Sequence, residues 1–200
     1  MPGIFITLEG GEGSGKTTII NAIDNHFKEM GYNTVTTREP GGVDILNVNN
    51  TKMCSETEAL LYAAARMQHL HEKVIPALLR GDVVICDRYI DSSLVYQGIA
   101  RGLGIDDVLK ANCFALNYMP NLTFFIDVRP EVGLKRIEGR DKIDRLDKEA
   151  FSFHQNVYNG YKKIASMYKD RIITIDGERP SELVVKDIIK HIDLYLNSRR

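Results

Sequence analysis

The sequence has few of the features that mark secreted, membrane or polymer-binding proteins. It contains only three cysteines, Cys54, Cys86 and Cys113, and none of them is in CxxC spacing. This fits neither a disulfide framework nor a zinc site and favours a reducing cytoplasm. No stretch approaches the ~18 apolar residues of a membrane helix, and the N-terminus lacks the basic and long apolar regions of a targeting segment. We therefore expect a soluble, cytoplasmic protein without a membrane partner.

An excess of charge of either sign is also absent. Lys and Arg total 26 against 27 Asp and Glu, giving a formal net charge of -1. Such a balance provides no general attraction to nucleic acid polymers or anionic membranes, so any anion must be bound locally. With 200 residues, 44% of them hydrophobic, the chain can bury one core. We expect a single domain over residues 1–200.

Short apolar runs alternate with segments of helical periodicity, which predicts βαβ units and a parallel sheet covered on both faces. Strands are expected at Ile4–Glu9, Thr34–Arg38, Val83–Asp87, Leu122–Val128 and Arg171–Asp176.

Local signals place the first two helices. One is expected from Gly15 to about Met30. The second should begin at Ser55–Glu58, which has the spacing of a capping box, and continue through the apolar-periodic stretch Ala59–Leu79. Pro76 should kink or shorten this second helix, because proline cannot donate the helical hydrogen bond.

The strongest local motif follows the first predicted strand. Gly10-Gly11-Glu12-Gly13-Ser14-Gly15-Lys16-Thr17, with Thr18 after it, matches GxxxxGK[ST] between a strand and a helix. Its backbone N–H groups would bind the phosphates of ATP, Lys16 would reach the β- and γ-phosphates, and the Thr17 hydroxyl would ligate Mg²⁺. Asp87 ends a strand that resembles Walker B, whose carboxylate assists the metal. An ordinary Gly-rich turn is the alternative, but the flanking elements argue against it.

A P-loop indicates a nucleotide but not a reaction, so the second substrate depends on other residues. Arginine holds phosphate bidentately, and ligands of open α/β sheets bind at the carboxyl ends of the strands. Arg38 closes the second predicted strand and Arg88 follows the third. Both are placed to hold an acceptor phosphate.

Four segments complete a recognisable set: Thr37–Gly42 (TREPGG), Tyr62–Arg66 (YAAAR), Asp87–Tyr89 (DRY) and Ser92–Gly98 (SSLVYQG). With these motifs in order, the chain resembles the thymidylate kinase family over nearly its whole length. The resemblance implies a three-layer α/β P-loop NTPase fold with a five-stranded parallel sheet in the order 2-3-1-4-5, and a homodimer. It also implies transfer of the γ-phosphate of ATP to dTMP.

The resemblance further implies roles at the acceptor. Arg38 and Arg88 would hold the dTMP phosphate, Tyr62 would stack on thymine, and Arg66 would donate to its O4. Because cytosine carries an amino donor at that position, Arg66 should disfavour cytidylate.

Four more roles come from the same source. Ser93 and Gln97 would contact the other polar edge of the base, and Tyr96 would lie against the 2′ carbon of the sugar and exclude ribonucleotides. Glu12 would take the 3′-hydroxyl.

Gly13 stands where some members of the family carry an arginine, so positive charge near the transferred phosphate must come from elsewhere. The segment at about 138–146 resembles the lid of members that supply arginine from there. This implies that Arg140 and Arg145 act in catalysis beside Lys16, with Arg136 near the adenine. A solvated charge run is the alternative.

Two rival functions stay open on the residues alone. A P-loop kinase of a deoxynucleoside or of a different monophosphate would keep the P-loop but should not need both Arg38 and Arg88. A non-enzymatic nucleotide-binding switch would leave Arg66 and Tyr96 without a role.

Overall fold

The computed structural model describes residues 3–40, 53–138 and 149–199. Five parallel strands form one sheet in the order β2-β3-β1-β4-β5, which confirms the predicted order. The strands are β1 (Ile4–Glu9), β2 (Thr34–Arg38), β3 (Val83–Asp87), β4 (Leu122–Asp127) and β5 (Ile172–Asp176). Predicted and observed bounds agree, except that β4 ends and β5 begins one residue inside the prediction.

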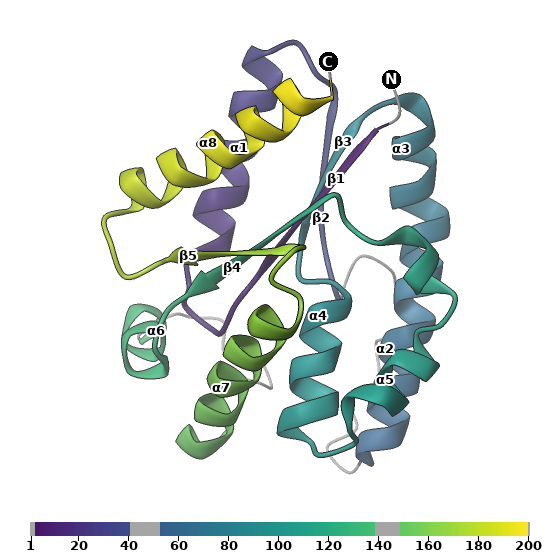
Figure 1. Ribbon diagram of the computed structural model, residues 1–200. Helices are drawn as coiled ribbons and strands as arrows, with labels where there is room; N and C mark the ends of the chain where they lie inside the picture. Colours follow the sequence, from purple (N-terminus) through teal and green to yellow (C-terminus); the bar gives the residue numbers. More distant parts are fainter. Residues whose placement is uncertain (1–2, 41–52, 139–148, 200) are drawn as a thin grey trace.

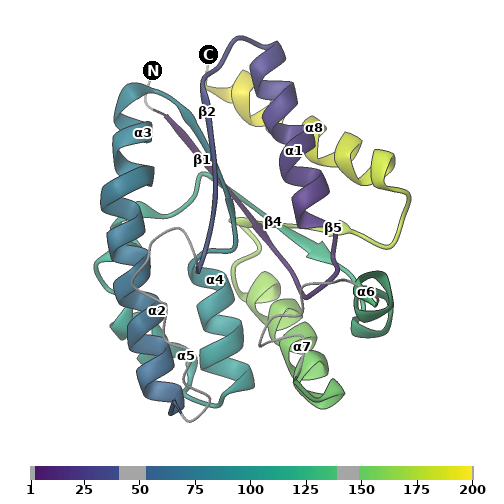
Figure 2. The ribbon, with the colours of Figure 1, turned by 180° about the vertical axis from the view of Figure 1, so that it is seen from behind.

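Helices cover both faces of the sheet, giving three layers (Figures 1 and 2). One face carries α1 (Lys16–Glu29) and α8 (Ser181–Ser198), and α6 (Pro130–Ile137) lies beside the end of β4. The other face carries α2 (Ser55–His69), the π-helical turn η2 (Leu70–Val74), α3 (Ile75–Arg80), α4 (Ile90–Ser93), the π-helical segment η3 (Leu94–Ala100), α5 (Ile105–Ala111), the 3₁₀ turn η4 (Ala115–Tyr118) and α7 (Phe151–Met167). None of the helices in the described ranges is long and apolar enough to cross a bilayer.

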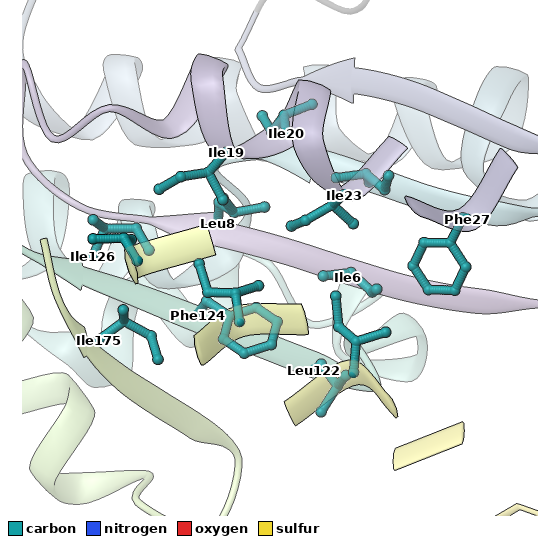
Figure 3. Packing of buried hydrophobic residues seen from close by; sticks show 14 of the residues in the cluster. Ile6, Leu8, Ile19, Ile20, Ile23, Phe27, Leu122, Phe124, Ile126 and Ile175 are labelled. Atoms are coloured by element: carbon teal, nitrogen blue, oxygen red, sulfur yellow. The ribbon is translucent and has the colours of Figure 1, made fainter. Parts of the chain in front are cut away.

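The two-residue period of the strands divides the core between the two faces. Ile6 of β1 and Phe124 of β4 pack against α1 and α8, as Figure 3 shows, whereas Phe5 and Phe125 contact helices on the opposite face. Because both faces are covered, the central strands β1, β3 and β4 are buried and mostly apolar along their length, whereas the edge strands β2 and β5 are partly exposed. Each fully buried aliphatic or aromatic side chain contributes about 1.5–3 kcal/mol. This packing fixes the strand ends that carry the site.

The predicted capping box is wrong. Ser55 is the first helical residue of α2, and the N-cap is Cys54, whose Sγ lies 3.1 Å from Thr57 Oγ1. Glu58 does not return to the start of the helix; its carboxylate is buried and accepts a hydrogen bond from Gln97 Nε2 at 2.8 Å. A tertiary contact has therefore overridden the local capping preference.

Two π-helical segments interrupt regular helix. α2 ends at His69, and η2 follows it and ends two residues before Pro76, in agreement with the expected effect of a proline that cannot donate a hydrogen bond. η3 follows α4 without a break and was not predicted. Such wide turns are frequent at functional sites because they change which residues share a helix face.

Candidate active site

The P-loop leaves the carboxyl end of β1 and leads into α1. Its wrapping depends on glycines in conformations that other residues rarely adopt, with φ of 68° at Gly13 and 88° at Gly15. The loop also lies against α6, since a Cβ added at Gly13 would collide with the carbonyl oxygen of Gly133. Backbone packing on α6 therefore sets the position of the loop.

The Lys16 side chain lies over this loop. Its ammonium group donates to the carbonyl oxygens of Gly10 and Gly11 and to Ser14 Oγ, each at 3.1 Å. Burial, together with the nearby Arg88 charge, lowers the pKa of Lys16 below its ordinary value of 10.5. The lysine is buried, whereas Thr17 and Thr18 are exposed on the first turn of α1.

Arg88 connects the P-loop to the helices of the other face. Its backbone is left-handed, with φ of 66°, an uncommon conformation for a residue other than glycine. The guanidinium donates to the Gly10 carbonyl at 2.9 Å, to the Tyr161 hydroxyl at 3.0 Å and to Glu12 Oε1 at 2.6 Å. It also lies 5.0 Å from the centroid of the Tyr96 ring. Among the described residues, these three hydrogen bonds leave two of the five guanidinium N–H groups for a ligand.

Glu12 and Tyr96 meet beside Arg88, so the structure brings together three residues that were predicted to contact the acceptor. The Tyr96 hydroxyl donates to Glu12 Oε1 at 3.1 Å. Burial alone would raise the pKa of Glu12, but the charges of Arg88 and Lys16 and the hydrogen bond from Tyr96 lower it below 4.5. Glu12 is therefore an anion at neutral pH.

Arg38 and Asp87 end the neighbouring strands β2 and β3 and are paired in register. The Arg38 residue is exposed, and no hydrogen bond or ion pair holds its side chain within the described ranges. Asp87 Oδ1 is buried and accepts no hydrogen bond from the described residues. A buried carboxylate oxygen without a donor is costly, and a cation or metal-bound water would satisfy it.

The predicted base-contacting residues come from two helical segments that lie side by side. Tyr62 and Arg66 are four residues apart on α2 and so share a face, as does Glu58, which was not predicted at the site. Opposite them are Ser93 of α4 and Gln97 of η3. Arg66 Nη2 donates to Ser93 Oγ at 3.0 Å, and Gln97 Nε2 donates to Glu58 Oε1 at 2.8 Å.

The Arg66 guanidinium is held by three residues to which the sequence analysis assigned no role, Glu39, Asn112 and Tyr89. Its Nε donates to Glu39 Oε2 at 2.7 Å, Nη1 donates to Asn112 Oδ1, and Nη2 also donates to the Tyr89 carbonyl at 3.2 Å. Glu39 is oriented in turn by His69, whose Nδ1 lies 2.9 Å from Glu39 Oε1. With the bond to Ser93, four of the five N–H groups are used. Arg66 is thus fixed as a donor with little freedom to move.

Glu9 is a buried residue beside the site to which the sequence analysis gave no role. Its carboxylate accepts from the Tyr89 amide at 2.8 Å and from the hydroxyls of Ser92 and Tyr161. Burial and the neighbouring Asp91 charge raise the pKa of Glu9 from 4.5 to about 7. The only signal was a carboxylate at the end of an apolar strand directly before the P-loop.

Of the three arginines predicted at the ATP site outside the P-loop, only Arg136 belongs to the described residues. Arg136, near the C-terminus of α6, donates from both Nη atoms to the Gly177 carbonyl at 3.1 Å, beyond the end of β5. Arg140 and Arg145 lie outside the described residues, as does nearly all of the expected lid.

Comparison with known proteins agrees with these features. The model of a family described as thymidylate kinase matches residues 8–188. The thymidylate kinase of Clostridium novyi is 51% identical over 197 residues, which cover 93% of this chain and 96% of that protein. That of Bacillus velezensis is 50% identical over 204 residues, covering 96% of each. The crystal structure of thymidylate kinase from Ehrlichia chaffeensis superimposes with a TM-score of 0.79 at 28% identity, covering 96% of this chain and 100% of that one.

Proposed function

The chain belongs to the thymidylate kinase family, and we propose that the residues gathered at the carboxyl ends of β1, β2 and β3 carry out that family's reaction. The chain is an ATP-dependent phosphotransferase that acts on dTMP. The bond between the γ-phosphorus and the β,γ-bridging oxygen of ATP breaks, and a bond from the dTMP phosphate to that phosphorus forms. The products are ADP and dTDP.

The donor site is proposed at the P-loop, where backbone N–H groups and Lys16 bind the ATP phosphates. Lys16 now uses its donors on Gly10, Gly11 and Ser14, and phosphate oxygens would replace these acceptors. Because the Lys16 side chain is already held over the loop, binding of ATP would require little movement of that side chain.

Mg²⁺ fits the residues at the end of β3. Asp87 presents a buried oxygen without a donor, and Thr17 presents an exposed hydroxyl at the start of α1. Within the described ranges no group of three or more His, Cys, Asp or Glu side chains could hold a metal. That suits Mg²⁺, which is bound by one or two protein groups with water and substrate phosphates. When bound, the ion would supply positive charge between the phosphates of ATP.

The acceptor phosphate is assigned to Arg88 and Arg38. The observation that carries the assignment is the position of Arg88, which bonds to the P-loop at Gly10 and Glu12 while covering the Tyr96 ring. A phosphate bound by its two remaining N–H groups would lie beside the donor site. Arg38, exposed at the adjacent strand end, would reach the same phosphate.

The nucleoside of dTMP is proposed to occupy the space lined by α2, α4 and η3. Tyr62 would stack on the thymine, while Arg66, Ser93 and Gln97 read its polar edge. Glu12 would accept the 3′-hydroxyl proton in a hydrogen bond, and the Tyr96 ring would leave no room for a 2′-hydroxyl. The hydrogen bond between Tyr96 and Glu12 holds these two side chains together.

The proposed chemistry requires positioning rather than a general base. The acceptor phosphate is largely dianionic near pH 7, since its second pKa is about 6. Repulsion between two polyanions is the main barrier, so alignment and positive charge at the transferred group supply the catalysis. Lys16, Arg38 and Arg88 provide that charge, with Arg140 and Arg145 proposed to close over ATP and Arg136 to lie near the adenine.

The test is ADP release measured over a panel of nucleosides and nucleoside monophosphates. We expect dTMP to give the highest kcat/KM and thymidine to give none above the ATP-only rate. Lys16→Met, purified in parallel, controls for contaminating kinases. Turnover with another acceptor but none with dTMP would refute the substrate assignment.

We also propose a homodimer in the cytoplasm. Its support is that α2, α3 and the chain before β4, which lie along one side of the ribbon in Figure 1, carry exposed apolar residues: Leu60, Leu79, Phe114 and Leu116. The described cysteines are free thiols, which fits a reducing compartment. Light scattering after size exclusion tests the dimer, and Leu79→Glu with Phe114→Glu should yield monomers.

A further inference from the structure

We propose that Glu58 determines the preference for thymine over cytosine by fixing the orientation of the Gln97 amide. The inference rests on the proposed binding of dTMP between α2 and η3. Held in this way, Gln97 presents its carbonyl oxygen, and not its amino group, to the base. Glu58 would act through Gln97 without touching the substrate, and is therefore a positioning residue.

The contact between the two side chains allows only one orientation of the amide. Glu58 and Gln97 are both buried, at 4% and 2% exposure, with Gln97 Nε2 2.8 Å from Glu58 Oε1. A carboxylate can accept hydrogen bonds but cannot donate them, so the amino end of the amide must face Glu58. A reversed amide would place two oxygen atoms in contact inside the protein. Arg101 Nε, 3.8 Å from the same carboxylate oxygen, provides a compensating positive charge.

The carbonyl end of Gln97 therefore points away from Glu58. No described residue donates a hydrogen bond to this oxygen, so it is available to a ligand. Gln97 and Ser93 are four residues apart along α4 and η3, and Ser93 is bonded to Arg66 on the facing helix. The two base-reading groups, Gln97 and Arg66, are thus tied together by contacts between the same two helical segments.

The polar edge of thymine matches this arrangement. Its O4 accepts a hydrogen bond and its adjacent N3–H donates one. Arg66 offers only donors, and the fixed Gln97 offers an acceptor beside it. Cytosine reverses both groups, with an amino donor at position 4 and an acceptor at N3. The amino group of cytosine would face the donors of Arg66, and its N3 acceptor would face the carbonyl oxygen of Gln97.

Of the two residues proposed to contact the polar edge of the base, only Gln97 could form hydrogen bonds with cytosine instead. A guanidinium has no acceptor, and Arg66 is held by Glu39, Asn112 and Tyr89. An amide, by contrast, can rotate by 180° and present its amino group to N3 of cytosine. Glu58 prevents this rotation, and so turns a residue that could pair with either base into one that pairs with thymine.

The experiment compares Glu58→Gln with wild type, using kcat/KM for dTMP, dUMP and dCMP. Glutamine has nearly the shape of glutamate but can both donate and accept, so Gln97 would be free to turn. We expect use of dCMP relative to dTMP to rise about tenfold, the factor set by one buried hydrogen bond. The ratio of dUMP to dTMP should not change, because uracil and thymine present the same polar edge.

Two controls separate this role from simple loosening of the site. Glu56→Gln changes an exposed residue in the same first turn of α2 and should leave every ratio at the wild-type value. Glu58→Asp keeps an acceptor-only group and should retain discrimination against dCMP. Should Glu58→Gln fail to fold, Glu58→Met, similar in length and without hydrogen-bonding groups, tests the same rise.

The outcomes distinguish the inference from the function on which it rests. Wild-type protein without activity on dTMP would refute the proposed function. Active wild type combined with a Glu58→Gln variant that loses dTMP, dUMP and dCMP turnover to the same extent would overturn the positioning role alone. An unchanged ratio of dCMP to dTMP in that variant would overturn it as well.

Discussion

Replacement of Gly133 by alanine gives the sharpest test of how the P-loop is held. Gly133 lies inside α6, where alanine is the better helix former by about 1 kcal/mol. Helix propensity alone therefore predicts a more stable protein. The structure predicts the opposite, because a Cβ at this position would lie well under 3.0 Å from the carbonyl oxygen of Glu12.

The size of the effect follows from that contact. Restoring a normal separation of about 3.5 Å requires the backbones of α6 and the P-loop to move apart by on the order of 1 Å. Overpacking of this kind costs about 1–3 kcal/mol, which outweighs the gain in helix propensity. A displacement of about 1 Å in a group that positions a substrate reduces the rate by about a hundredfold. We expect a net loss of stability of about 1 kcal/mol and a fall of about a hundredfold in kcat/KM for ATP.

Urea unfolding and steady-state kinetics with varied ATP measure the two effects. Lys135→Ala is the matched control, since Lys135 is exposed on the same helix and replacement by alanine should leave both quantities near wild type. A Gly133→Ala variant that is more stable than wild type and retains its kcat/KM for ATP would refute the close packing of α6 on the P-loop.

Three further outcomes are expected. Arg88→Ala should raise the KM for dTMP by about 10- to 100-fold, which is the range for losing a hydrogen bond to a charged group. The KM for ATP should change less. Equal changes in both KM values would contradict the assignment of Arg88 to the acceptor site. Tyr96→Phe, which loses only the hydrogen bond to Glu12, should still reject UMP relative to dUMP, whereas Tyr96→Ala should accept it; unchanged discrimination in the alanine variant would contradict the steric role. Burial and Asp91 raise the pKa of Glu9 from 4.5 to about 7 in the folded protein, so its contribution to stability is present below about pH 4.5 and is lost as the pH rises through 7. Glu9→Gln should therefore lose less stability than wild type across that interval in urea titrations, and parallel curves for the two proteins would contradict the raised pKa.

Much of the fold, including the turn of the P-loop, could be predicted from sequence because the signals are local. All five strands were placed to within a residue. The signal was clearest for β1, β3 and β4, since a strand buried on both faces requires mostly apolar side chains. The P-loop could also be predicted, because its turn requires glycine at positions with positive φ, such as Gly13 and Gly15. The identity of the family followed from motifs whose order along the chain is itself sequence information.

The failures arose where a distant residue competed with a local preference. Ser55 and Glu58 have the spacing of a capping box, but Glu58 is drawn to Gln97, 39 residues away, and the cap passes to Cys54. The π-helical form of η3 was also hidden, since no composition rule marks such a turn when packing produces it.

The sequence by itself therefore determined the strands, the phosphate-binding turn and the family. Only the tertiary structure decided which side chains pair: Arg88 donates to Glu12 across 76 residues, and the Tyr161 hydroxyl donates to Glu9 across 152. The physical reason is the distance along the chain over which each property is determined. Backbone conformation depends on a few neighbouring residues, whereas a hydrogen-bond partner or a shifted pKa depends on which strand ends the sheet order brings together.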